Sequence, residues 1–108
     1  MTADFRQLPG AELILEGMDD LERNVDSVPA LLVSIGAPRL RRLGVPVLPE
    51  SALPQDPELR LYRLLCRDGD SGAHSRFNAL IRRLVSFERC LEFQHYRELR
   101  LRAGRGPA

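Results

Sequence analysis

The stretch that decides the fold is the last third of the chain, where residues 73–101 read AHSRFNALIRRLVSFERCLEFQHYRELRL. Apolar residues recur in it every three or four positions, which is the spacing of one face of an α-helix. Most of them fall on one broad face, and we expect that face to pack on the core. Its members are Ala73, Phe77, Leu80, Ile81, Leu84, Val85, Phe87 and Leu91. A helix of this length extends about 40 Å, whereas helices of about 10 to 15 residues reach only about 15 to 22 Å. The C-terminal helix is therefore predicted to outrun the rest of the molecule.

A first helix is predicted upstream, over about residues 11–24. Pro9-Gly10 marks its start, because this pair interrupts regular structure. Its core-facing residues are predicted to be Ile14, Met18, Leu21 and Val25, and the opposite side carries Glu12, Glu16, Asp19, Asp20 and Glu22. Glycine in a helix interior is unfavourable by up to about 1 kcal/mol relative to alanine. We therefore interpret Gly17 as a place where another helix crosses closely.

A second helix is predicted to begin at Ser27, a good N-cap, with Pro29 in the first turn. Residues 30–37 read ALLVSIGA and are apolar almost all round, which is typical of a central helix covered on several sides. Pro38 lacks a backbone N–H, so the helix is predicted to kink or restart there. Gly44 is predicted to cap its C-terminus.

The rest of the chain predicts one more helix and two linkers. Residues 45–57 contain four prolines and are expected to cross the surface as an extended connection. A third helix is expected over about residues 58–67, and residues 68–72 (DGDSG) are expected to end it and to cap the last helix. No strand pattern is present. We therefore expect an all-α fold in one domain, residues 1–108, a small bundle of four principal helices with a long C-terminal helix, in which residues 1–9 and 102–108 are flexible.

The charges of the chain are unevenly distributed. The formal net charge is +1, and all sixteen cationic residues are arginine, which is typical of a GC-rich bacterial genome. Residues 1–26 carry seven acidic residues and two arginines, whereas residues 76–105 carry eight arginines and three acidic residues. Such a chain can pair its own ends, bind a charged partner or associate with itself.

Several classes of function lack support in the sequence. Cys66 and Cys90 are 24 positions apart among aliphatic neighbours, so we expect two reduced, buried thiols in a cytoplasmic protein. Residues 68–72 resemble the start of a calcium loop, but Ala73 and Ala79 stand where that loop needs glycine and glutamate. His74 with Asp70 or Cys66 is the only hint of an enzyme, and Ser75 lacks the glycine-flanked context of a nucleophile. We therefore expect no enzymatic activity, cofactor or metal.

Glu88 falls inside the apolar face of the C-terminal helix. A carboxylate there is unfavourable unless an arginine reaches it. We therefore predict a structural ion pair between Glu88 and one of the arginines at positions 39, 41, 42 and 63.

Phe93 falls on the opposite face, beside Arg82, Ser86 and Arg89. Tyr96 and Leu99 can continue an apolar strip from Phe93, interleaved with Arg97, Arg100 and Arg102. Such a strip suits a partner helix or a seam between two copies, while a frayed tail is the alternative.

These observations favour a non-enzymatic bacterial interaction module, such as an accessory subunit, an adaptor or an antitoxin-like partner. The predicted partner-binding residues are Arg82, Arg89, Phe93, Tyr96, Arg97, Leu99 and Arg100. Another protein or a second copy, giving a homodimer, would bind there. The alternative is a nucleic-acid-binding module that uses Arg82, Arg83, Arg89, Arg97 and Arg100, although the motifs of known nucleic-acid-binding folds are missing. No apolar run is long enough to span a membrane, so no membrane association is expected.

Overall fold

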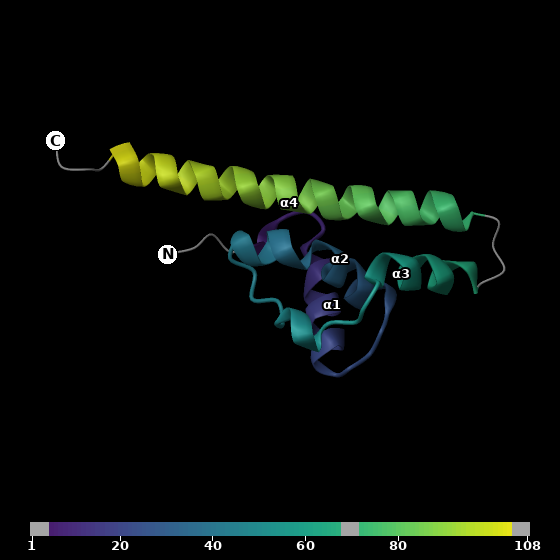
Figure 1. The fold of residues 1–108 in the computed structure, drawn as a ribbon. Helices are drawn as coiled ribbons and strands as arrows, with labels where there is room; N and C mark the ends of the chain where they lie inside the picture. Colours follow the sequence, from purple (N-terminus) through teal and green to yellow (C-terminus); the bar gives the residue numbers. More distant parts are fainter. Residues whose placement is uncertain (1–4, 68–71, 105–108) are drawn as a thin grey trace.

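The computed structural model describes residues 5–67 and 72–104. In this part of the chain it contains four α-helices, two short 3-10 helices and no strand. The α-helices are α1 (Ala11–Glu22), α2 (Val28–Arg42), α3 (Pro57–Cys66) and α4 (Ala73–Gly104), and the 3-10 helices are η1 (Phe5–Gln7) and η2 (Glu50–Ala52). In Figure 1, α4 forms a long rod, and the three shorter α-helices gather along one side of it. The predicted all-α fold with a long C-terminal helix is confirmed.

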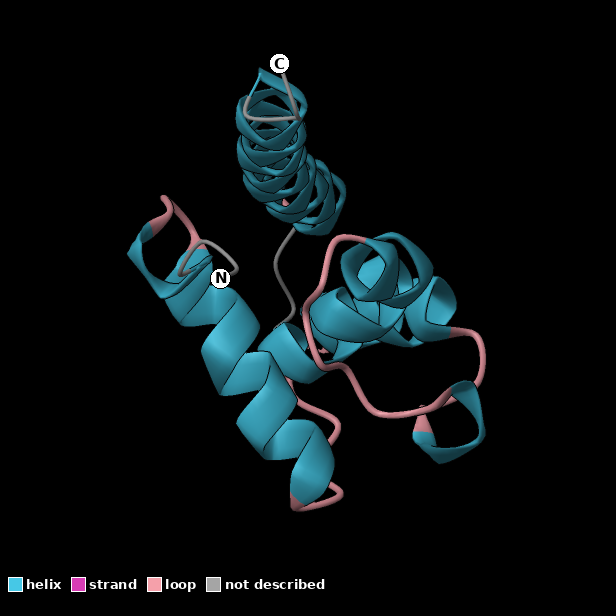
Figure 2. Cartoon of the chain, turned by 90° about the vertical axis from the view of Figure 1, so that its left-hand side faces the viewer, coloured by secondary structure: helices cyan, strands magenta, loops and turns pink. Residues whose placement is uncertain are grey.

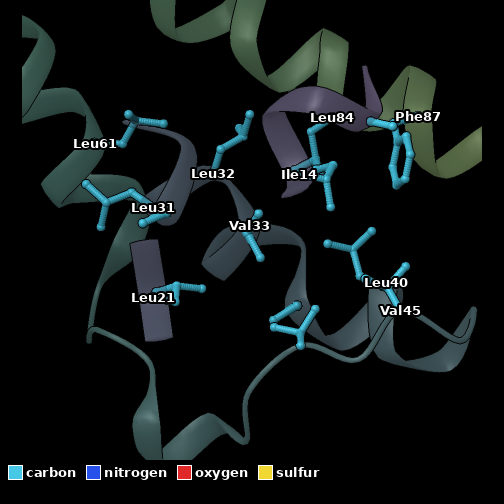
Figure 3. Close-up of a cluster of buried hydrophobic side chains, with 14 of the residues drawn as sticks. Ile14, Leu21, Leu31, Leu32, Val33, Leu40, Val45, Leu61, Leu84 and Phe87 are labelled. Carbon is cyan, nitrogen blue, oxygen red and sulfur yellow. The ribbon is translucent and has the colours of Figure 1, made fainter. Parts of the chain in front are cut away.

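Helix α2 is the centre of the core. Residues 30–33 are all at most 1% exposed, as is Ala37, and Leu40 is completely buried. Figure 3 shows how α1, α3 and α4 each contribute side chains around it, among them Ile14, Leu61 and Phe87. The apolar run of α2 therefore lies between neighbouring helices, as its composition predicts.

Two glycines allow other helices to approach α2 closely. A Cβ atom added at Gly17 of α1 would lie 2.3 Å from the carbonyl oxygen of Pro29 and 2.6 Å from Cγ2 of Val33. A Cβ atom added at Gly36 of α2 would lie 2.9 Å from Cδ1 of Leu84 and 3.0 Å from Oε2 of Glu88. The predicted close crossing at Gly17 is confirmed, and the α2–α4 crossing at Gly36 is a second one.

The end of α1 differs from the prediction. The helix ends at Glu22, and Asn24 adopts a left-handed conformation with φ of 59°. This turn directs Val25 away from the core, and the residue is 46% exposed. The prediction that Val25 faces the core is therefore wrong. The same turn brings Ser27 over Asp20, whose carboxylate accepts a 2.5 Å hydrogen bond from the Ser27 hydroxyl. Asp20 is consequently buried rather than part of the acidic outer face.

Helix α2 starts as predicted but does not restart at Pro38. The Ser27 hydroxyl oxygen accepts a hydrogen bond from the backbone N–H of Ala30, which makes Ser27 the N-cap. Pro38 lies inside a helix that continues to Arg42. Burial of Ala37 and Leu40 on either side of it favours continuation over the loss of one backbone hydrogen bond. Gly44 follows with φ of +95°, as expected for a C-terminal cap.

The segment between α2 and α3 is more buried than its four prolines predict. Val45 and Val47 are buried in the core, and η2 interrupts the connection. The Arg41 side chain donates hydrogen bonds to the carbonyl oxygen of Leu48, which holds the segment against α2. Residues 45–57 are therefore in part a core element, because alternate valines point inward.

Helix α3 covers the N-terminal part of α4. Leu61 and Leu65 point into the core, while the ring of Tyr62 meets that of Phe77 edge-to-face at 5.9 Å. The expected burial of both cysteines is wrong for Cys66, which is exposed, and Cys90 is only partly buried. Cys66 follows the inward Leu65 by one position and so points about 100° away from it. The loop predicted at residues 68–72 lies mostly outside the described residues.

Helix α4 is longer than the globule on which it packs. Its 32 residues extend about 48 Å at 1.5 Å per residue. The radius of gyration is 15.8 Å, compared with about 13 Å expected for a compact chain of this length. Residues 5–7, predicted to be a loose end, instead form η1, and the Phe5 ring packs edge-to-face on Phe87 at 6.4 Å. None of the helices in the described ranges combines the length and apolar character needed to cross a membrane.

The two glycine crossings differ in what an added methyl group would meet, and this gives a testable difference in stability. In Gly17→Ala the methyl group meets backbone, which cannot rotate away, so we expect a loss of about 2 kcal/mol in the free energy of unfolding despite the better helix propensity of alanine. In Gly36→Ala it meets the ends of Leu84 and Glu88, which can move, so we expect a change within about 1 kcal/mol. Urea unfolding of both variants measures the difference, and equal losses would contradict the rigid contact at Gly17.

Candidate functional site

The C-terminal part of α4 extends past the last buried side chain of the helix. Leu91 is 5% exposed and is the last buried residue in the described side chains of α4. The helix then continues for 13 residues, about 20 Å, to Gly104. We call residues 92–104 the arm. Figure 1 shows α4 extending past the other helices, and Figure 2, viewed toward its C-terminal end, shows those helices on one side of it. The arm still meets the end of α2 at its start, where Arg39 contacts Glu92.

The arm exposes apolar side chains that the core does not use. Phe93 is 69% exposed, Tyr96 60% and Leu99 46%, and Leu101 is also exposed. At 100° per residue, Phe93 lies about 160° around the helix from Leu91, so it points away from the core. Leu99 lies about 120° from Phe93, which puts the predicted strip on a path that winds around the arm. Helix α4 runs through this region, so the predicted alternative of a frayed tail is not what the structure contains.

The outer face of α4 also carries arginines without internal partners. Arg82, Arg89, Arg97 and Arg100 are exposed. None of them forms an ion pair with a side chain in the described part of the chain. Their neighbour Arg83, by contrast, lies 3.4 Å from Glu12 of α1. Six of the seven candidate partner-binding residues therefore share one outer surface, within about 100° of arc, and Leu99 lies to one side of it.

Two of the three acidic residues of α4 contact α2. Arg39 of α2 reaches both of them, with Nη1 at 3.5 Å from Oε1 of Glu88 and Nη2 at 3.0 Å from Oε2 of Glu92. Among the four arginines considered for Glu88, Arg39 is the one that reaches it. The second acceptor, Glu92, was missed in the sequence, although its spacing of four from Glu88 places the two carboxylates on the same helix face.

The environment of Glu88 disfavours its charged form. The side chain is buried where α4 crosses α2. Burial raises the pKa of Glu88 above its ordinary value of 4.5, Arg39 opposes the rise, and the nearby charge of Glu92 adds to it. The closer contact of Arg39 is with Glu92, which explains why one guanidinium does not compensate fully for the burial of Glu88.

The residues considered for an enzyme lie on exposed surfaces or outside the described residues. Nε2 of His74 lies 3.2 Å from the side-chain nitrogen of Asn78 on the exposed surface of α4. Cys66 is exposed at the end of α3, and Asp70 and Ser71 lie outside the described residues. Among the described residues no group of three or more histidine, cysteine or acidic side chains is arranged to hold a metal ion. A hollow between α2 and residues 50–58 is lined by Arg41 and by three acidic residues, Glu50, Asp56 and Glu58.

The raised pKa of Glu88 predicts how the free energy of unfolding depends on pH. Because its pKa is raised in the folded protein, the folded state retains a proton that the unfolded chain has already released. The free energy of unfolding therefore falls as the pH rises from the ordinary pKa of Glu88 through its raised value. Glu88→Gln removes this titration, so we expect the stability of the variant relative to the wild type to increase between about pH 4 and about pH 7.

Thermal unfolding at a series of pH values measures this difference. Glu16→Gln, at an exposed position of α1, is the control for removing a carboxylate at the surface. A difference between wild type and Glu88→Gln that stays constant across the range would contradict the buried position of the Glu88 carboxyl.

Phe87 and Phe93 offer a matched pair on one helix. Phe87 is completely buried, so Phe87→Ala should lower the free energy of unfolding by about 3 to 5 kcal/mol. Phe93→Ala should change it by no more than about 0.5 kcal/mol, because an exposed ring contributes little to the core. Urea unfolding tests both, and a large loss in Phe93→Ala would show that the ring belongs to the fold.

No protein-family model, curated protein or solved structure matches this chain. The candidate site is therefore defined by the contacts and charges of the chain itself. Its features are an exposed pair of aromatic rings, a set of unpaired arginines around them, and acidic neighbours that are held on the inner side of the helix.

Proposed function

We propose that this chain is a non-enzymatic interaction module, and that the outer face of α4 binds another protein. The observation that supports this most strongly is the exposure of Phe93 and Tyr96 on a helix that continues past its own core. Aromatic residues and arginine are among the residue types that are enriched at protein interfaces. An accessory subunit, an adaptor or an antitoxin-like partner fits a small domain with one such surface.

The shape of the arm supports a helical partner. A single helix is convex and offers no groove to an extended peptide. A second helix can lie along it and pack its side chains between those of the first. Figure 2 looks toward the C-terminal end of α4 and shows the other helices on one side of it. The opposite side of α4 leaves room for a partner helix.

The proposed setting is the cytoplasm of a bacterium. The two free cysteines fit a reducing compartment, and the use of arginine alone among the basic residues fits a GC-rich genome. These features support the setting but do not identify the partner.

A photo-crosslinking residue placed on the arm tests the proposal. We expect benzoylphenylalanine at position 93 or 96 to yield one discrete, protease-sensitive adduct in cells of the source organism. The same residue at Leu59, which is 50% exposed on α3, should yield none. Because the partner must occupy the aromatic surface, added wild-type protein should suppress the adduct, whereas the Phe93→Ala, Tyr96→Ala variant should not.

The results separate the proposed functions. Absence of an adduct at both arm positions, or an equal adduct at Leu59, would overturn the proposal. A nuclease-sensitive adduct would favour the second candidate, a nucleic-acid-binding module. The observation behind that candidate is that Arg82, Arg89 and Arg100 lie within about 20° of arc on α4 and are all exposed, as a phosphate-binding ridge requires.

A further inference from the structure

Four residues on the outer face of α4 form a regular series. Arg89, Phe93, Tyr96 and Arg100 are separated by four, three and four positions. At 100° per residue they fall within about 60° of arc, along about 16 Å of helix. This spacing is that of the contact line between two helices that pack side by side. We call these four residues the seam, and all of them are exposed.

Both arginines of the seam are available to an outside partner. Arg89 has Glu92 three positions further along α4, but Arg39 of α2 holds that carboxylate at 3.0 Å. Arg100 follows Glu98 by two positions, which places the two side chains about 200° apart around the helix. Neither arginine forms an ion pair with a described side chain, so the seam presents two uncompensated positive charges.

The spacing of the seam disfavours a second copy as its partner. The series four, three, four reads the same in both directions. When two seams align their aromatic pairs, whether parallel or antiparallel, each Arg89 or Arg100 therefore faces an arginine of the other copy. Like charges in such flanking positions oppose association and select against the wrong partner.

We infer that the seam recognises an amphipathic helix of another protein in which two apolar residues three positions apart are each flanked, four positions outward, by a carboxylate. The inference rests on the proposed protein-binding function and specifies the partner's chemistry. The apolar pair covers Phe93 and Tyr96, while the two carboxylates pair with Arg89 and Arg100. The symmetrical spacing accepts either direction of the partner helix. The other occupants, a second copy and a nucleic acid, are outcomes of the tests.

Two synthetic helices serve as probes. Both have an alanine-rich background and leucine at the two apolar positions, and they differ only in carrying glutamate or lysine at the two flanking positions. NMR titration of the full chain with each peptide measures the affinity and maps the contact. We expect the glutamate peptide to shift the signals of residues 89–100 and to bind at least about tenfold more tightly than the lysine peptide, because the latter places like charges together.

Charge reversal of the seam provides the decisive comparison. In Arg89→Glu, Arg100→Glu the preference should reverse, so that the lysine peptide binds at least about tenfold more tightly. The control Arg63→Glu, Arg67→Glu changes the net charge equally at two exposed arginines of the α3 region, away from the seam, and it should keep the wild-type preference.

Equal binding of the two peptides to the wild type, binding of neither, or reversal by the control variant would overturn the inference. Sedimentation of the wild type alone should give a monomer, and a dimer that Phe93→Ala disrupts would also overturn it. The crosslinking experiment judges the broader proposal separately. A protein adduct on the arm combined with failure of the peptide series would leave the binding function in place and remove the assigned partner chemistry.

Discussion

The close approach of neighbouring helices to α2 determines the arrangement of this molecule. Gly17 allows the backbone of α1 to pack against Pro29 of α2. Gly36 allows α4 to approach α2 so closely that the side chains of Leu84 and Glu88 contact Gly36. Neither position has space for a larger side chain without movement of its neighbours. This short distance between α4 and α2 brings Glu88 within reach of Arg39, which lies about one turn after Gly36 on α2.

The contact at Arg39 links the core to the surface. The helical spacing places Glu88 and Glu92 on the side of α4 that faces α2, and this guanidinium pairs with both carboxylates there. Glu92, three positions after Arg89, is therefore paired across the helices and not along α4. Arg89 on the outer face forms no ion pair with a described side chain. A structural interaction in the core therefore shapes the surface that we propose for binding.

Helix α4 is part of the core along one stretch and extends beyond it along another. The stretch up to Leu91 contributes Leu84, Phe87 and Leu91 to the core, as Figure 3 shows for the first two, and the stretch after it exposes Phe93 and Tyr96. The projecting part inherits its helical geometry from the anchored part, because extending an existing helix is far easier than starting one. The aromatic rings are thus presented on a preformed element, which lowers the ordering cost of binding.

The spacing of residues along the chain is sufficient to predict the helices and the direction of most of their side chains. Periodicity placed α4 and its apolar face, Ser27 and Gly44 marked the ends of α2, and Gly17 indicated a close crossing, because these signals arise from interactions between residues near one another in the chain. The packing of the helices sets which arginine reaches Glu88 and that Glu92 shares it. It also buries Asp20 under Ser27 and brings Val45 and Val47 into the core. Each of these depends on which helix lies against which, a choice made by long-range packing that local spacing does not encode. For the same reason Phe93, Tyr96 and the nearby arginines form a recognisable pattern in the sequence, whereas their contacts follow only from the structure. The Tyr96 ring lies 6.1 Å from that of His95, and neither Arg89 nor Arg100 forms an ion pair with a described side chain.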